Sequence, residues 1–194
     1  MYKHGWELNM RNMLLLVFSL ALVGCQATAG DGGGTVIPPG QPAPPGSTNT
    51  SFRANPERWI LTRREEGASR KSTYLCRPLA CEKPTTIVYS NRNSPTRNPD
   101  AGALKERAEQ TRKILESRGY KDITVKNGNV LGYPATMIEF STTRDGKKTY
   151  VADVEIFAGA ALIGMMSASS DRRVAIKHRE EMTLSIEIND GGSR

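Results

Sequence analysis

The chain has 194 residues and a formal net charge of +7, and 38% of its residues are hydrophobic and 24% charged. This length accommodates one folded domain with tails, and the apolar fraction is too high for a chain that is disordered throughout. No apolar run approaches 18 residues, which argues against a membrane-spanning helix.

The first 25 residues predict export. Arg11 supplies a positive charge, residues 13–23 form an apolar stretch of 11 residues (MLLLVFSLALV), and Gly24 and Cys25 follow. A basic start, a short apolar stretch and a small-residue cleavage site are the three parts of a secretory signal. The alternative is a buried apolar helix that a cysteine follows by chance.

The run Leu22-Val23-Gly24-Cys25 resembles the lipobox of bacterial lipoproteins at all four positions. The resemblance implies a signal peptide over residues 1–24 and a diacylglyceryl group with palmitate-like chains on Cys25, which would hold the protein in membrane lipid. Each buried methylene contributes about 0.8 kcal/mol to such an anchor. Because Gln26 and not an aspartate follows, the resemblance also implies the outer membrane, with the domain in the periplasm. The alternative is an ordinary signal peptide.

A tether is expected to follow the cysteine. Residues 25–52 contain GDGGG, IPPG and PAPPGSTNT and only one charged residue, Asp31. Such a segment cannot bury enough apolar area to offset the entropy lost on ordering. We therefore expect one globular domain over residues 53–189 and a disordered tail over 190–194. The alternative for the tether is an ordered arm that lies on the domain.

Basic residues are concentrated in the first part of the domain. Residues 53–99 hold 10 Lys or Arg and 4 Asp or Glu, whereas residues 100–194 hold 15 and 14. A positive field attracts anions, which in an envelope are lipid headgroups, lipopolysaccharide phosphates and cell-wall carboxylates. Nucleic acid is not an expected partner of an exported protein. The candidate anion-binding residues are Arg58, Arg63, Arg64, Arg70, Lys71 and Arg77, and the alternative is an ordinary solvated surface.

Two cysteines remain after Cys25. Cys76 and Cys81 have four residues between them in the run LCRPLAC. Exported proteins meet an oxidising compartment, so a disulfide between them is expected. The alternatives are a metal pair, which lacks further Cys or His ligands, and a redox pair, whose motif has two intervening residues.

Apolar periodicity and turn residues predict an α+β fold, an antiparallel sheet with two packing helices. The expected order is three strands, a helix, four strands and a second helix. Asn98-Pro99-Asp100 starts the first helix, Gly119 ends it, and Ser170 caps the second. A turn is expected at Asn127-Gly128. The strands are expected at 58–63, 72–75, 86–90, 122–126, 134–143, 148–157 and 159–169, and the helices at 100–118 and 171–185.

The hairpin around Asp145-Gly146 allows a register to be predicted. A two-residue loop would place Ile138 opposite Asp153, with mismatched faces. A three-residue loop over 144–146 places Ile138 opposite Ala152 and Phe140 opposite Tyr150, and puts Gly146 where a left-handed residue is needed. We therefore predict the three-residue loop.

From residue 133 to residue 188 the pattern resembles the PsbP-like fold, which also occurs in bacterial lipoproteins. The features that carry the resemblance are Gly132-Tyr133-Pro134-Ala135 at the start of a strand, the Asp145-Gly146 hairpin, and a final helix that ends near Leu184-Ser185-Ile186. These are packing motifs over about a third of the chain. The resemblance implies no catalytic residue and leaves function open.

The sequence shows no catalytic signature, so we expect no catalytic residue, metal or cofactor. His178 is the one histidine after Cys25 and lies on the apolar stripe of the last helix, where packing against the sheet is expected. In the predicted register Glu139 and Asp153 share a sheet face, as an acid–base pair or as solvated side chains. The sequence favours a non-enzymatic binding or assembly module of the cell envelope. The alternative is a periplasmic enzyme or enzyme inhibitor.

Overall fold

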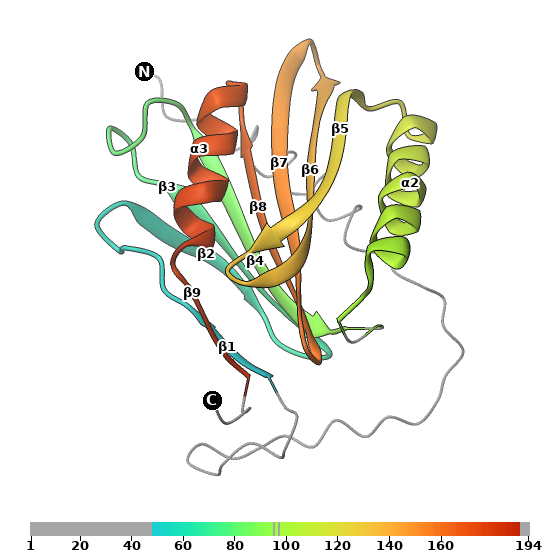
Figure 1. The fold of residues 1–194 in the computed structure, drawn as a ribbon. Helices are drawn as coiled ribbons and strands as arrows, with labels where there is room; N and C mark the ends of the chain where they lie inside the picture. The colour runs from blue at the N-terminus through green and yellow to red at the C-terminus, as the bar shows by residue number, and fades with distance from the viewer. Residues whose placement is uncertain (1–47, 95, 97, 191–194) are drawn as a thin grey trace. The chain divides into compact units, whose positions relative to one another are not determined.

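A computed structural model describes residues 48–94, 96 and 98–190. The described chain contains strands and two helices in the order expected of an α+β protein, which confirms the predicted fold class (Figure 1). The elements are β1 (Thr48–Phe52), β2 (Trp59–Glu65), β3 (Ser69–Cys76), β4 (Thr85–Asn93), α2 (Ala101–Ser117), β5 (Lys121–Val130), β6 (Tyr133–Arg144), β7 (Lys147–Ala158), β8 (Ala161–Ser169), α3 (Arg172–Thr183) and β9 (Ile186–Asp190).

Seven of the strands form one antiparallel sheet. Their spatial order is β2-β3-β4-β8-β7-β6-β5, so α2 carries the chain from the inner strand β4 to the far edge strand β5. Strand β8 then returns to pair with β4. A separate two-stranded sheet joins β1 to β9, and Phe52 of β1 stacks on Tyr89 of β4.

The two helices pack on opposite faces of the sheet. On one face Met182 of α3 joins a core that includes Ile156 and Ile163, and α3 crosses this face in Figure 1. On the other face Leu104 of α2 packs with Phe157 and Leu162. Because neighbouring residues of a strand point to opposite faces, both faces of β7 and β8 carry buried apolar side chains.

The helix ends follow from local chemistry. The Asp100 carboxylate accepts the Ala103 N–H at 2.8 Å and caps α2, and Gly119 ends it with φ of +78°. Helix α3 is capped by Asp171, whose Oδ1 accepts the Arg173 N–H at 2.8 Å. The predicted cap, Ser170, is therefore wrong by one residue, because the carboxylate of Asp171 reaches the first free amides.

The predicted β6–β7 register is wrong. The structure pairs Arg144 with Lys147, Ile138 with Asp153 and Phe140 with Val151, around a two-residue loop. Asp145 and Gly146 both have positive φ, 51° and 71°, as the type I′ hairpin turn requires. The prediction assumed that only one face of the hairpin is buried, whereas α2 and α3 cover one face each.

Two further differences concern turns and termini. Asn127 and Gly128 lie inside β5, and the turn is at Leu131-Gly132, whose φ angles are 54° and 86°. Strand β1 occupies the last residues of the expected tether, so the described strands include residues before Arg53, the expected start of the domain. Its partner β9 lies far away in the sequence, where local patterns cannot reveal the pairing.

Neither described helix is both long enough and apolar enough to cross a bilayer.

Candidate functional site

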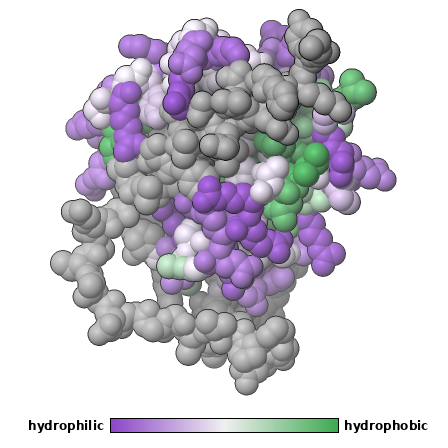
Figure 2. Space-filling view, turned by 180° about the vertical axis from the view of Figure 1, so that it is seen from behind, coloured by the Kyte–Doolittle hydropathy of each residue, from purple (hydrophilic) through white to green (hydrophobic). Residues whose placement is uncertain are grey.

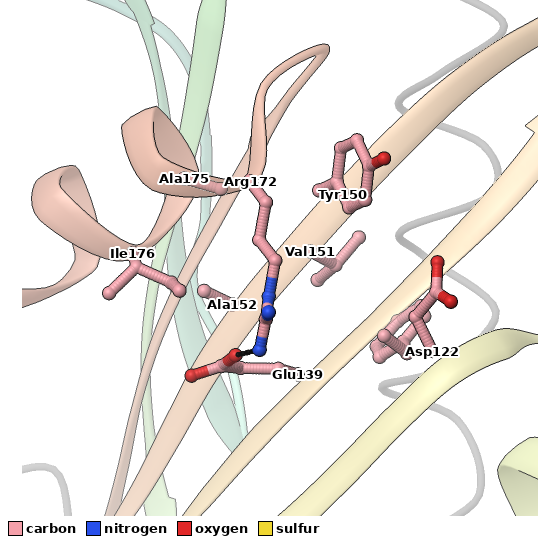
Figure 3. A pocket seen from close by; sticks show the side chains of 9 residues that line it. Asp122, Glu139, Tyr150, Val151, Ala152, Arg172, Ala175 and Ile176 are labelled. Carbon is pink, nitrogen blue, oxygen red and sulfur yellow. Dashed lines mark hydrogen bonds and ion pairs between the residues drawn. The ribbon is translucent and has the colours of Figure 1, made fainter.

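A small polar pocket lies where the start of α3 meets β5, β6 and β7 (Figure 3). The volume of the pocket is about 10 Å³, enough for one water molecule. Polar side chains from four elements meet there because the sheet register brings β5, β6 and β7 together beneath α3. The lining residues are Asp122, Glu139, Phe140, Tyr150, Val151, Ala152, Arg172, Ala175 and Ile176.

Glu139 is held between two arginines of α3. Arg172 Nη2 donates to Glu139 Oε2 at 2.8 Å, and Figure 3 shows the Arg172 side chain reaching from the helix across Ala152 to that carboxylate. On the other side, Arg179 Nη1 lies 3.6 Å from Glu139 Oε1. The Arg179 side chain is 7% exposed, and its Nη2 also contacts Glu180. A charge so deeply buried requires this pairing, since an isolated one would be costly.

Asp122 forms the opposite wall of the pocket. Its φ of +55° accompanies the register irregularity between Lys121 and Thr124, and its carboxylate accepts the Ser141 hydroxyl at 2.7 Å. Lys148 Nζ lies 2.8 Å from the same carboxylate. The hydrogen bonds from Lys148 and Ser141 lower the pKa of Asp122 below its ordinary value.

These contacts limit what the pocket can do chemically. Glu139 and Asp122 each face a cation, and the lowered pKa of Asp122 makes that carboxyl a poor proton donor at neutral pH. Arg172 and Lys148 remain about half exposed at the rim, at 56% and 46%. The arrangement can bind a small polar group, and the sequence did not predict it because its residues come from four separate segments.

The expected pair of Glu139 and Asp153 is absent. In the observed register Glu139 lies opposite Ala152 and Ile138 lies opposite Asp153, so the two acids point to opposite faces. Glu139 shares its face with α3, whereas Asp153 lies on the face of α2. The two acids are separated because the hairpin loop has two residues and not the predicted three.

A second cluster of charged side chains lies near Asp153 on the α2 face. Glu155, two residues along β7, accepts from Arg92 at 3.2 Å and from Arg107 Nη2 at 2.7 Å. Burial, and then the nearby Glu155 charge, raise the pKa of Asp153 from 3.8 to about 7. Two acids two positions apart on a strand share a face, so the sequence could have indicated that Asp153 and Glu155 lie together. It could not have indicated their arginine neighbours, which come from β4 and α2.

The structure spreads the candidate anion-binding residues over a hairpin, which we call the basic hairpin and define as β2 and β3 with the turn between them. Arg63 and Arg64 are adjacent on β2, and Arg70 and Lys71 are adjacent on β3, so each pair points to both faces of the sheet. Arg63 Nε also lies 2.6 Å from Glu65 Oε1. These basic residues are therefore spread along the edge of the sheet and do not converge on one binding site. Figure 2 shows mainly hydrophilic side chains among the described residues seen from behind.

The remaining two candidates lie at the base of the basic hairpin. Arg58 Nη1 lies 3.1 Å from Glu181 Oε2, and its Nη2 lies 2.8 Å from His178 Nε2. Arg77 Nε donates to the Pro56 carbonyl at 2.9 Å. Arg58 therefore couples the hairpin to α3, while Arg77 stays on the surface.

His178 packs against the sheet, as predicted. It is 2% exposed and meets the Trp59 ring edge-on, with 5.3 Å between ring centroids. Burial, followed by the positive charge of Arg58, lowers the pKa of His178 below its ordinary value. A neutral imidazole can accept the Arg58 N–H at Nε2, so His178 links α3 to β2.

Cys76 and Cys81 form a disulfide at the end of β3. Cys25, the predicted lipidation site, lies outside the described residues. Among residues 48–94, 96 and 98–190, no three His, Cys, Asp or Glu side chains gather as a metal site would require.

Comparison with known proteins gives structural similarity only. No protein-family model and no curated protein matches the chain. The fold is similar to that of LpqN of Mycobacterium tuberculosis, described as involved in cell envelope biogenesis, with 16% identity and a TM-score of 0.48 over 75% of this chain and 86% of that one. It is also similar to PA94 of Pseudomonas aeruginosa, a protein of unknown function, with 12% identity and a TM-score of 0.43 over 68% and 89%. Similarity at this level carries no information about function.

Proposed function

We propose that this chain is a lipid-anchored module of the bacterial cell envelope. In this proposal Cys25 holds it in the outer membrane, and the periplasmic domain binds an envelope protein or an anionic envelope component without transforming it. The lipobox-like run 22–25 and the apolar stretch before it support the anchor. The disulfide between Cys76 and Cys81 is in keeping with an exported domain.

The observation that carries the binding function is the exposed basic hairpin. The basic hairpin holds four Lys or Arg and two Asp or Glu, Arg58 and Arg77 flank it, and the five residues Ile60–Arg64 of β2 are all exposed. A cationic surface on an anchored domain would meet lipopolysaccharide phosphates and acidic partner surfaces at high local concentration. The attraction is screened by salt, so the affinity is expected to fall as ionic strength rises.

The binding claim can be tested with purified protein. The probes are lipopolysaccharide micelles and phosphatidylglycerol vesicles, with binding measured at about 50 and 500 mM salt. We expect the double variant Arg64→Glu/Arg70→Glu to weaken binding at low salt by about tenfold or more. The matched control is Arg112→Glu/Lys113→Glu on α2, which changes net charge equally and should leave binding within about twofold. Equal losses in both variants would contradict a site on the basic hairpin.

The anchor can be tested separately in cells. The Cys25→Ala variant should not incorporate labelled palmitate and should leave the membrane fraction, while an in-cell crosslink to a specific partner should be lost with the anchor. A variant that stays anchored would contradict the lipoprotein proposal and would require another explanation of residues 1–25.

A periplasmic enzyme or enzyme inhibitor is the second candidate, and Asp153 is the observation that favours it. A carboxyl group with a pKa of about 7 is suited to general acid–base chemistry at neutral pH. Its test is turnover of a panel of chromogenic ester, glycoside and phosphoester substrates. Turnover that Asp153→Asn abolishes would favour an enzyme over the binding module.

A further inference from the structure

The two edges of the seven-stranded sheet differ in what lies beside them. Strand β2 is the last strand of the seven-stranded sheet, and within the described part of the chain β3 is its only strand partner. The opposite edge, β5, is flanked by α2, as Figure 1 shows. An unflanked edge presents backbone N–H and C=O groups that can pair with another strand.

The direction of these groups can be derived from one hydrogen bond. The Arg77 N–H donates to the Arg58 carbonyl at 2.9 Å, which makes residues 58 and 77 a hydrogen-bonded antiparallel pair. Such pairs alternate along a ladder, so Ile60 also bonds toward β3 while Leu61 turns its N–H and C=O away from β3. Consistent with this phase, the Trp59 N–H bonds to the Asn55 carbonyl at 2.9 Å and not to β3.

The side chains along this edge combine exposed apolar and exposed basic residues. Ile60 and Leu61 are 37% and 43% exposed and lie on opposite faces of the sheet. They are followed, after an irregularity in register at Thr62, by the exposed Arg64 and by Arg63, which is exposed and also contacts Glu65. Like charges along the same strand disfavour pairing with a second copy, whereas acidic side chains would be attracted.

We infer that the β2 edge accepts an extended acidic segment of another polypeptide as an eighth strand of the sheet. The incoming strand places apolar side chains beside Ile60 and Leu61 and acidic side chains beside Arg63 and Arg64. Backbone pairing at Leu61 supplies the common part of the affinity, and the side chains supply the specificity. This inference rests on the proposed binding function and names its partner class.

The test uses the full chain in detergent and a fluorescent peptide with two acidic residues followed by a spacer and two apolar residues. Binding is measured by anisotropy. One control peptide carries lysines in place of the acids, and another carries N-methyl groups on alternate residues, so that one backbone edge cannot pair. We expect each control peptide to bind at least about tenfold more weakly than the parent.

Two variants examine the same edge from the protein side. Leu61→Pro removes the outward N–H and should weaken peptide binding about tenfold or more, whereas Leu61→Thr keeps the N–H and should weaken it by less than about fivefold. Should Leu61→Pro fail to fold, amide hydrogen exchange of the wild type answers the question. Peptide binding should slow exchange at the Leu61 amide and leave the Ile60 amide, already paired with β3, unchanged.

The outcomes separate this inference from the proposed function. Equal binding of the N-methylated and parent peptides would overturn strand addition. Binding of lipopolysaccharide or anionic vesicles without binding of any peptide would overturn the inference and leave the envelope-binding function standing. Self-association through β2, seen by sedimentation and abolished by Leu61→Pro, would also overturn it in favour of a second copy as the occupant.

Discussion

His178 and Arg58 make the contact between α3 and β2 dependent on pH. The charged groups around the imidazole are Arg58, Lys177, Glu181 and Glu82, and the pKa of His178 is lowered chiefly by burial. As pH falls below about 6.5 the unfolded chain takes up a proton that the folded chain resists, so the free energy of unfolding decreases. Denaturant midpoints at pH 7.5 and 5.5 should therefore differ less in His178→Gln than in the wild type. An identical pH dependence in both proteins would contradict this account.

Asp153 has the opposite dependence. Between its ordinary pKa of 3.8 and the folded value of about 7, the folded state keeps a proton that the unfolded state has lost. The free energy of unfolding therefore falls as pH rises across this range, and the full cost is present above pH 7. Asp153→Asn should raise stability at pH 8 by about 1 to 3 kcal/mol and have little effect at pH 4. Thermal melts at the two pH values measure this, and a variant destabilised at pH 8 would show that ionised Asp153 is well solvated.

The turn of the β6–β7 hairpin determines which acidic side chains lie together on each face of the sheet. Its two-residue turn assigns Glu139 to the α3 face and Asp153 to the α2 face, which separates the two acids. Gly146 makes this turn possible at φ of +71°. We expect Gly146→Ala to cost about 1 kcal/mol in chemical denaturation, because a side chain in the left-handed region is strained. Asp145→Asn is the matched control and should be nearly neutral, and equal losses in both would argue against a type I′ turn.

Features that depend on local sequence could be predicted, whereas the hairpin register and the pocket could not. The helices over residues 100–118 and 171–185, the disulfide and the antiparallel sheet follow from periodicity, caps and export, and the structure agrees with them. The hairpin register was mispredicted because a buried face was assumed on one side only. The polar pocket could not be predicted, since Asp122, Glu139 and Arg172 lie on different elements that only the sheet order brings together.

The proposed function places the domain on a tether that starts at the anchored Cys25. The described domain begins at Thr48, 23 residues after Cys25, and a flexible chain of that length has a mean span of roughly 27 Å. We expect this distance to let the basic hairpin reach both lipid headgroups and neighbouring envelope proteins. A second acyl chain would make the attachment far more stable than one chain can.

The lipid anchor is tested by the mass of the N-terminal peptide of protein isolated from bacterial membranes. We expect a mature chain that starts at Cys25 and carries a diacylglyceryl group on its thiol. A chain that keeps residues 1–24, or one cut in this region without lipid on Cys25, would contradict the lipid-anchored envelope module.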